Sequence, residues 1–426
     1  MKKRIVPSAV RGEIEIPGSK SHTIRALLIA ALADGESVLR QPLFSEDTRA
    51  CIAVCRAFGA EVAEEEGALR VRGVGRRFEA AAGGADVMNS GTTLFFAAAL
   101  AALQSRPFRL SGDASIENRS AAPLLDALRT LGAAVSCEKK EGCAPFTVCG
   151  PLRSGRVKID CPTSQYLSAL LIALPAADGN FEIETGILKE KPYVDMTKKW
   201  LDDRMIAYSA DEEYKNIFIP GGQIYRPFDI AVPADFSSAC FFLCAAAVTR
   251  SRLTFTNLDM CDVQGDKEVV FLLEKMGCRL TFEGKKVTVE GNRLKGIEID
   301  MTAIPDALPV LAVTACYAEG ETRLFNAAHT RLKETDRIRC MTAELTKLGA
   351  DITELPDGMV IRGCGRLKGG AVLSYGDHRI AMALAVAGLA AEAPVTVDGA
   401  EAAAVTFPDF YRLLAAVSEN PQPGLL

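Results

Sequence analysis

A lysine, a serine and an arginine stand close together where an apolar segment begins near the N-terminus. In GSKSHTIRALLIAAL, Lys20 and Arg25 are five residues apart, with Ser21 between them, directly after a Pro-Gly turn. The free N–H groups and the positive dipole end of a helix N-terminus attract anions, so this set could bind a phosphate group. A capped surface helix has the same pattern, but the apolar run that follows indicates a buried helix and favours phosphate binding.

Two further apolar segments begin with polar residues. Thr163, Ser164 and Gln165 open TSQYLSALLIAL, and Asp306 lies at the start of IPDALPVLAV. Each of these residues could simply be an N-cap. Asp306, placed beside an anion site, could instead accept a proton from a substrate hydroxyl.

The densest charged stretch is RLKETDRIR, residues 331–339. Charged runs are usually solvated helix faces, but this one follows the apolar strand TRLFNAA and starts a helix. A second polar start, GDHR, opens the apolar segment after residue 376. The three histidines, His22, His329 and His378, all lie in or beside these motifs, which is unlike a set of core histidines.

These polar starts belong to a repeat. Six times, about 72 residues apart, a polar or glycine-bearing turn opens an alanine-rich apolar helix, and repeats of fixed period decide a fold. The six openings are PGSKSHTIRALLIAAL, NSGTTLFFAAALAAL, CPTSQYLSALLIAL, ADFSSACFFLCAAAV, IPDALPVLAVTACYA and GDHRIAMALAVAGLA. If six like helices pack alike, their N-termini gather on one side and create a surface for anions.

A second series, in phase with the first, consists of CRAFGAEV, ALRTLGAAV, LEKMGCRL and LTKLGADI, with WLDDRMIAYS as a degenerate member. Each predicts an outer helix that ends at a glycine, followed by a strand. Each repeat is therefore expected to run strand, inner helix, strand, outer helix and strand pair, which is an α/β fold. Two unrelated α/β domains would not explain the common period.

The repeats group into two predicted domains. One comprises residues 16–230 and the other residues 1–15 together with 231–426, so that the first strand pairs with the C-terminal half. The predicted crossovers, at 15–18 and 227–233, are rich in Pro or Gly.

Composition excludes several classes of function. The chain has 426 residues, 49% hydrophobic and 24% charged, and a net charge of −5, which argues against a nucleic-acid-binding role. No segment resembles a signal peptide or a bilayer span, so we expect a cytoplasmic protein that does not enter a membrane. The 13 scattered cysteines indicate idle or buried thiols rather than a metal site.

Taken together, the motifs resemble those of 5-enolpyruvylshikimate-3-phosphate (EPSP) synthases. GSKSxTxRALLxAAL, NSGTT, TSQYLSALL, EKPYVDMT, IPDA, RLKETDRI, DHRxAM and TFPDF occur in that family's order over essentially the whole chain. The resemblance implies a two-domain inside-out α/β barrel of six repeats that closes on its substrates. It also implies transfer of the enolpyruvyl group of phosphoenolpyruvate to the 5-hydroxyl of shikimate 3-phosphate, with release of phosphate. We expect no metal or cofactor, and a monomer.

The same resemblance assigns roles to residues. Those that would bind shikimate 3-phosphate are Ser21, Arg25, Thr163, Ser164, Gln165, Tyr193, Asp306 and Lys333. Those that would bind phosphoenolpyruvate are Lys20, Gly91, Arg119, Gln165, Arg337 and Arg379. Those that would take part in catalysis are Asp306 and Lys333, at the 5-hydroxyl proton, Glu334, at the proton of the methylene carbon, and Lys20.

Three residues depart from the family pattern. Phe95 stands where an arginine is usual, Glu190 replaces the serine before KPY, and Val405 replaces a lysine ahead of TFPDF. Three hypotheses of function therefore remain: an active synthase with weakened ligand contacts, a non-catalytic relative that binds a phosphorylated metabolite, and an enzyme for another phosphorylated acceptor. The retained acidic and basic cluster favours the first.

Overall fold

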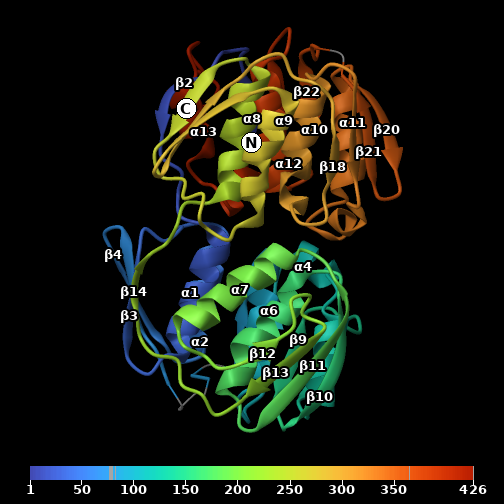
Figure 1. Ribbon diagram of the computed structural model, residues 1–426. Coiled ribbons are helices and arrows are strands. Elements are labelled where there is room, and N and C mark those ends of the chain that lie inside the picture. The colour runs from blue at the N-terminus through green and yellow to red at the C-terminus, as the bar shows by residue number, and fades with distance from the viewer. Residues whose placement is uncertain (76–79, 82, 364, 426) are drawn as a thin grey trace. The chain divides into compact units, whose positions relative to one another are not determined.

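Small β-sheets with helices buried beside them make up both halves of the chain (Figure 1). The computed structural model describes residues 1–75, 80–81, 83–363 and 365–425, and in this part of the chain it has six sheets. The chain divides into two compact units. Unit 1 comprises Met1–Ser19 and Pro233–Leu426, and unit 2 comprises Lys20–Val232.

The six apolar segments form the inner helices. They are α1 (Lys20–Leu32), α3 (Gly91–Ala101), α6 (Ser164–Ala173), α8 (Phe236–Val248), α10 (Leu308–Cys316, after the 3₁₀ turn η3, Pro305–Ala307) and α12 (His378–Leu389). Every residue of α8 and of α12 is buried. A helix that is apolar all round belongs in a core, so the sequence pattern and the burial agree.

Four of the outer helices end at the glycines that the sequence pattern indicates. The outer helices are α2 (Glu46–Ala57), α5 (Ala122–Thr130), α7 (Lys191–Asp203), α9 (Glu268–Met276), α11 (Arg337–Lys347) and α13 (Phe410–Val417), with a short helix α4 (Ala114–Asn118) before α5. Gly59, Gly132, Gly277 and Gly349 follow four of them with φ between 90° and 116°, a conformation that glycine adopts without strain. After α7 the left-handed residue is Met205, with φ 55°, which explains why that member of the series is degenerate.

Five of the sheets share one strand order, in which a parallel pair is followed by an antiparallel pair. In unit 2 these are β14-β3-β5-β4, β6-β7-β9-β8 and β10-β11-β13-β12, and in unit 1 they are β2-β15-β17-β16 and β18-β19-β21-β20. Unit 1 also holds the three-stranded sheet β1-β23-β22. An inner helix joins the parallel strands of β6-β7, β10-β11, β18-β19 and β22-β23, as parallel pairing requires a crossover connection.

The strands have the following bounds. In unit 2 they are β3 (Glu36–Arg40), β4 (Glu61–Glu65), β5 (Ala68–Arg72), β6 (Gly84–Asp86), β7 (Phe108–Ser111), β8 (Ala134–Cys137), β9 (Phe146–Cys149), β10 (Gly155–Cys161), β11 (Asn180–Leu188), β12 (Ser209–Ala210), β13 (Asn216–Pro220) and β14 (Asp229–Ala231). In unit 1 they are β1 (Lys2–Ile5), β2 (Arg11–Ile14), β15 (Arg252–Phe255), β16 (Arg279–Glu283), β17 (Lys286–Glu290), β18 (Glu298–Asp300), β19 (Glu321–Phe325), β20 (Asp351–Leu355), β21 (Gly358–Arg362), β22 (Gly370–Leu373) and β23 (Val395–Asp398).

Two strands lie in a different unit from the inner helix that they precede, which amounts to a strand exchange between repeats. β2 precedes α1 along the chain but pairs in parallel with β15, and β14 precedes α8 but pairs in parallel with β3. β1 likewise pairs with β23, near the C-terminus. The pairing of the N-terminal strands with the C-terminal half, expected from the repeat, is thus observed, whereas the domain limits read from the sequence remain predictions.

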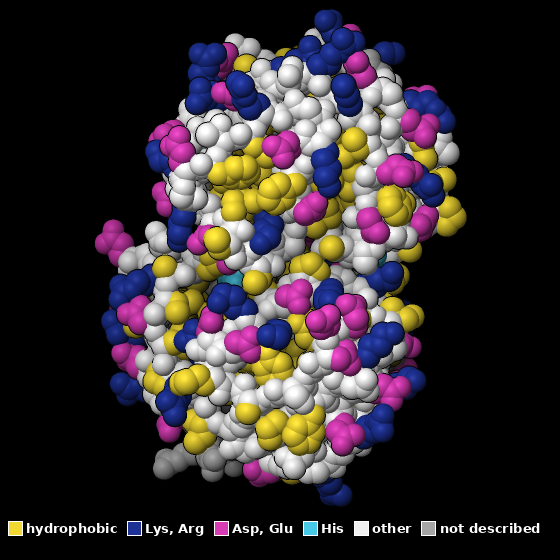
Figure 2. Space-filling model, viewed as in Figure 1, with side chains coloured by type: hydrophobic (Ala, Val, Ile, Leu, Met, Phe, Trp, Pro, Cys, Tyr) yellow, Lys and Arg dark blue, Asp and Glu magenta, His cyan; other side chains and the backbone are white. Residues whose placement is uncertain are grey.

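The surface and the thiols fit the composition. Figure 2 shows Lys and Arg side chains interspersed with Asp and Glu over the visible face of each unit. Cys51 and Cys55 on α2, and Cys240 and Cys244 on α8, are buried thiols. In the described part of the chain, no three metal-binding side chains cluster, and no helix has the length and apolarity that a bilayer crossing requires.

Candidate active site

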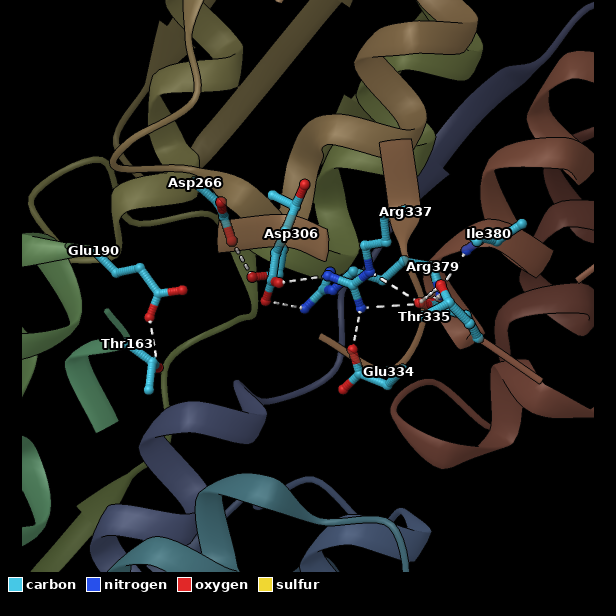
Figure 3. Close-up of polar contacts among 12 residues, drawn as sticks. Thr163, Glu190, Asp266, Asp306, Glu334, Thr335, Arg337, Arg379 and Ile380 are labelled. Atoms are coloured by element: carbon cyan, nitrogen blue, oxygen red, sulfur yellow. Dashed lines mark hydrogen bonds and ion pairs between the residues drawn. The ribbon is translucent and has the colours of Figure 1, made fainter. Parts of the chain in front are cut away.

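In unit 1, the side chain of Arg337 binds three carboxylates (Figure 3). It is 1% exposed. Its Nε lies 2.9 Å from Asp377, one terminal nitrogen 2.9 Å from Asp306, and the other 2.6 Å from Glu334. Burial lowers the pKa of Arg337, but the three carboxylates outweigh it, and the pKa stays above its ordinary value. Two acids of the predicted catalytic set are therefore bound to the same cation.

Arg379 binds the other oxygen of Asp306. Its terminal nitrogen lies 2.7 Å from Asp306 Oδ2, and the residue is 4% exposed. Asp306 lies in η3, directly before α10, and Arg379 in the first turn of α12, so the starts of two inner helices meet at this pair. The structure thus brings together Asp306, Glu334, Arg337 and Arg379.

Asp377 holds this arrangement in place. It is fully buried and is the N-cap of α12, where its Oδ1 accepts hydrogen bonds from the backbone N–H groups of Arg379, at 2.8 Å, and Ile380, at 3.4 Å. Its Oδ2 accepts from Arg337 and from the hydroxyl of Thr335, at 3.1 Å. One aspartate therefore fixes both a helix start and the orientation of Arg337.

A further buried acid, Asp266, lies near this group. It is 2% exposed, and the hydroxyl of Ser237, in the first turn of α8, donates a hydrogen bond to it. Burial, and then the charge of Asp306, raises the pKa of Asp266 to about 6, although Arg379 opposes this. A carboxyl group that titrates close to neutral pH can exchange protons, which is a property of catalytic sites.

The charged stretch at residues 331–339 contains both structural ion pairs near the surface and residues of the candidate site. Arg331 binds Asp336 and Glu354, at 2.6 and 2.7 Å, and Asp336 caps α11, so these residues are structural. Lys333 is half-buried, after the 3₁₀ helix η4 (Ala328–Leu332) and directly before Glu334. Arg337, by contrast, is buried rather than solvated.

In unit 2, Arg25 links predicted binding residues. Its Nε donates to Thr197 Oγ1 at 2.8 Å, and its terminal nitrogens donate to the carbonyl oxygens of Ser21 and Tyr193, each at 3.0 Å. It also lies 5.2 Å from the ring centroid of Phe96. Burial lowers the pKa of Arg25 to about 10, so it remains a cation at neutral pH. The structure brings Ser21, Arg25 and Tyr193 together.

Lys20, the first residue of α1, is paired with an acid that the sequence motifs did not indicate. Its Nζ lies 3.0 Å from Asp47, in the first turn of α2, and the two side chains are 15% and 6% exposed. A lysine held in this way is pre-oriented and keeps donors for an anion.

Two inner-helix starts of unit 2 are joined by polar contacts. Gln165 Nε2 donates to Thr92 Oγ1 at 3.1 Å, which connects the first turns of α6 and α3. The guanidinium of Arg119 lies directly against Gly91, where an added Cβ would be 2.2 Å from a guanidinium nitrogen. A side chain at position 91 would therefore require the Arg119 guanidinium to shift.

A carboxylate lies at the start of α6. Glu190 Oε2 accepts a hydrogen bond from the hydroxyl of Thr163 at 3.0 Å (Figure 3). It also accepts hydrogen bonds from the hydroxyl of Ser164, at 2.9 Å, and from the N–H of Ser164, at 3.1 Å. The two other departures from the family pattern are apolar residues. Phe95 is buried on α3 and packs edge-on against Tyr166, and Val405 is half-buried at the end of the 3₁₀ helix η5 (Ala400–Val405).

The prediction that the histidines are not core residues is wrong for His22. His22 is 4% exposed, and its Nδ1 accepts a hydrogen bond from the indole of Trp200 at 3.0 Å, so it is a core histidine with a partner. The acids Asp47, Asp266 and Asp377 were not among the predicted site residues. Of these, Asp377 lies inside the DHR motif, and its position directly before a buried helix was the signal for its role.

Comparison with known proteins identifies the family. The family model "EPSP synthase (3-phosphoshikimate 1-carboxyvinyltransferase)" matches residues 6–414. Proteins named 3-phosphoshikimate 1-carboxyvinyltransferase from Acetivibrio thermocellus and Methanocaldococcus jannaschii are 48% and 38% identical to the chain, over 97% and 96% of each protein. A solved EPSP synthase from Acinetobacter baumannii superposes with a TM-score of 0.82 at 28% identity and 98% coverage of each chain, which confirms the predicted fold class. The chain therefore belongs to the EPSP synthase family.

Proposed function

We propose that this protein transfers the enolpyruvyl group of phosphoenolpyruvate to the 5-hydroxyl of shikimate 3-phosphate and releases phosphate. The observation that carries the proposal is the family match over residues 6–414, together with relatives of the same name that align over nearly their whole length. The arrangement of acids and arginines in unit 1 supports it, because a non-catalytic relative would have no need for such a buried cluster.

The reaction imposes clear chemical demands. The 5-hydroxyl oxygen must form a bond to C2 of phosphoenolpyruvate, and the C2–O bond to phosphate must break. The hydroxyl loses a proton, and the methylene carbon gains one on addition and loses one on elimination. Acid and base groups are therefore needed at two different atoms. Asp306 and Lys333 are proposed for the hydroxyl, and Glu334 for the methylene carbon.

The substrates together carry two phosphates and two carboxylates, so binding depends on cations and helix N-termini. The residues proposed to bind shikimate 3-phosphate are Ser21, Arg25, Thr163, Ser164, Gln165 and Tyr193 in unit 2 and Asp306 and Lys333 in unit 1. Lys20 and Gln165 are proposed to bind phosphoenolpyruvate. For phosphoenolpyruvate we add Gly91 and Arg119 from unit 2 and Arg337 and Arg379 from unit 1.

In unit 1 the carboxylates fix the arginines. Arg337 contacts Asp306, Glu334 and Asp377, and Arg379 contacts Asp306, so both guanidinium groups are held in defined orientations. Preorganised charges stabilise a transition state without the cost of reorganising the site during the reaction. A fixed cation is thus the contribution that we assign to Arg337.

A phosphate-release assay with both substrates tests the proposal. We expect phosphate release only when both substrates are present. Mass spectrometry should then detect the enolpyruvyl ether of shikimate 3-phosphate in an amount equal to the phosphate released. No phosphate release at saturating concentrations of both substrates would favour a non-catalytic relative that binds a phosphorylated metabolite. Release with a different phosphorylated acceptor would identify an enzyme for that acceptor. Action as a monomer in the cytoplasm, without metal or cofactor, remains part of the prediction.

A further inference from the structure

Glu190 places a negative charge where the proposed function requires a phosphate. Thr163 and Ser164 form the N-terminal end of α6 and are proposed to bind shikimate 3-phosphate, and hydroxyls with a free N–H at a helix N-terminus are suited to its phosphate group. Their two hydroxyls and the N–H of Ser164 all donate to one oxygen of Glu190, at 2.9–3.1 Å. The carboxylate thus uses the same donors that the phosphate would use.

The position of Glu190 is a built feature of unit 2. The residue is 2% exposed and lies directly before α7, with φ 58° and ψ 40°, a left-handed conformation that is uncommon for residues other than glycine. Its backbone is fixed as well, because its carbonyl oxygen accepts a hydrogen bond from Tyr193 N–H at 3.0 Å. A buried glutamate in such a conformation is directed at α6 by its surroundings rather than by chance contact at the surface.

A carboxylate and a phosphate cannot share these donors. An N–H and two hydroxyls supply three hydrogens, all of which Glu190 takes up, and two anions a few ångströms apart in a poorly solvated site repel one another. A phosphate group can bind to Thr163 and Ser164 only when the Glu190 side chain has moved away. The free energy of that displacement is subtracted from the affinity for the phosphorylated acceptor.

We propose that Glu190 is a specificity-determining residue that competes, within the chain, with the phosphate of the acceptor for Thr163 and Ser164. This inference rests on the proposed function, since it takes shikimate 3-phosphate as the acceptor. The competition lowers the advantage of the phosphorylated acceptor over the same molecule without its phosphate. Shikimate, which has no phosphate to bring to this place, provides that comparison.

The test compares dissociation constants of shikimate 3-phosphate and shikimate, measured by calorimetry on the full chain. For Glu190→Ser we expect shikimate 3-phosphate to bind about tenfold more tightly, a gain of about 1.4 kcal/mol, while shikimate binding changes less than twofold. For Glu190→Gln, which removes the charge but still fills the space and accepts hydrogen bonds, we expect a smaller gain of about threefold.

A matched control separates local competition from net charge. Glu213 lies in the same unit, is exposed and binds Lys191 at 3.0 Å, so Glu213→Gln removes one negative charge next to α7 without touching α6. We expect it to leave both dissociation constants within twofold. Thermal unfolding of each variant shows that it is folded, and Glu190→Gln decides the question if Glu190→Ser does not fold.

The outcomes are distinguishable. Unchanged or weaker binding of shikimate 3-phosphate in the Glu190 variants, an equal gain for shikimate, or an equal gain in Glu213→Gln would overturn the inference. A wild-type protein that releases no phosphate, but whose preference for shikimate 3-phosphate still rises in Glu190→Ser, would reject the proposed function and retain the competition.

Discussion

At the scale of single residues, the buried cation Arg337 determines where the acids of unit 1 lie. Removing a guanidinium from water is costly, and only well-placed carboxylates offset that cost. Asp306, Glu334 and Asp377 do so at 2.6–2.9 Å. The acids proposed for catalysis are therefore also the partners of a proposed binding residue, and the two roles can be separated only by variants that preserve the hydrogen bonds.

Glu334→Gln is such a variant. A glutamine oxygen can still accept the hydrogen bond that Arg337 donates to Glu334 at 2.6 Å, but the side chain cannot take up or release a proton. We expect loss of turnover by at least about a thousandfold, in line with the contribution of a general acid or base, with the affinity for shikimate 3-phosphate within a few-fold of wild type. Phosphate release and calorimetry measure the two effects.

Glu354 provides the control for this change. It pairs with Arg331 at 2.7 Å on a half-exposed surface and belongs to the structural part of the charged stretch. Glu354→Gln should retain full activity. Full activity in Glu334→Gln would reject the catalytic role assigned to that residue.

Val405 is expected to weaken the binding of phosphoenolpyruvate, the second substrate. It stands where the family usually has a lysine that contacts phosphoenolpyruvate, and a charge-assisted hydrogen bond contributes about 1.5–3 kcal/mol. We therefore expect Val405→Lys to lower the Michaelis constant for phosphoenolpyruvate by about 10- to 100-fold. Inhibition by glyphosate, which resembles this substrate in charge, should strengthen in parallel.

Another cation, for example Arg412 or Lys368, could instead perform the function of the missing lysine. In the structure Arg412 pairs with Asp409 at 3.0 Å on an exposed face of α13. A wild-type enzyme that saturates at low micromolar phosphoenolpyruvate, and is inhibited by low micromolar glyphosate, would show that the valine has no such effect.

At the scale of the element, the start of α12 depends on Asp377. This residue caps the helix and neutralises a buried arginine at the same time. Asp377→Ala removes both contacts, and breaking a buried ion pair costs about 3–5 kcal/mol. We expect a loss of this size in the free energy of unfolding, measured by denaturant titration, because Arg337 would keep its charge with one partner fewer.

Asp113 allows the two contributions to be separated. It is the N-cap of α4, where it accepts a hydrogen bond from Ile116 N–H at 3.0 Å, and its second oxygen accepts one from the Asn89 side chain at 2.6 Å on an exposed part of the surface. Asp113→Ala should cost only about 1 kcal/mol, the usual value of an N-cap. Equal losses in the two variants would mean that the ion pair with Arg337 adds no stability.

The order of elements was predictable because local signals determine it. Apolar runs specify the inner helices, and Gly59, Gly132, Gly277 and Gly349 specify where four outer helices end. Met205 shows the limit of such signals, since a left-handed residue that is not glycine leaves no mark in the sequence. The fold class could thus be predicted, and the strand exchange followed from the phase of the repeat.

The partners within the site could not be predicted in the same way. Lys20 pairs with Asp47, and Arg25 with Thr197, which is 172 residues away. Such contacts depend on how inner and outer helices pack, and a motif records only one side of each pair. The sequence shows Glu190 as a departure from the family pattern, but only the structure shows its hydrogen bonds to Thr163 and Ser164.

At the scale of the whole molecule, proposed binding residues are divided between two units. Ser21, Arg25 and Thr163 belong to unit 2, and Asp306 and Arg337 to unit 1, while the chain passes between the units only twice, near residues 19–20 and 232–233. Two connections of this kind permit a hinge, because few backbone positions need to change when the units move.

We predict that shikimate 3-phosphate binds before phosphoenolpyruvate and brings the units together, because its proposed ligands include cations from both units, Arg25 and Lys333. Small-angle scattering should then show a smaller radius of gyration with shikimate 3-phosphate than without it, whereas phosphoenolpyruvate alone should cause little change. Because exposed charges are screened by salt, both the affinity and the compaction should weaken as ionic strength rises from about 0.01 to 1 M, over which the screening length falls from about 30 to 3 Å. Shikimate, which lacks the phosphate, is the matched control ligand and should cause less compaction at equal saturation. An unchanged radius of gyration at saturating shikimate 3-phosphate would exclude closure driven by this substrate.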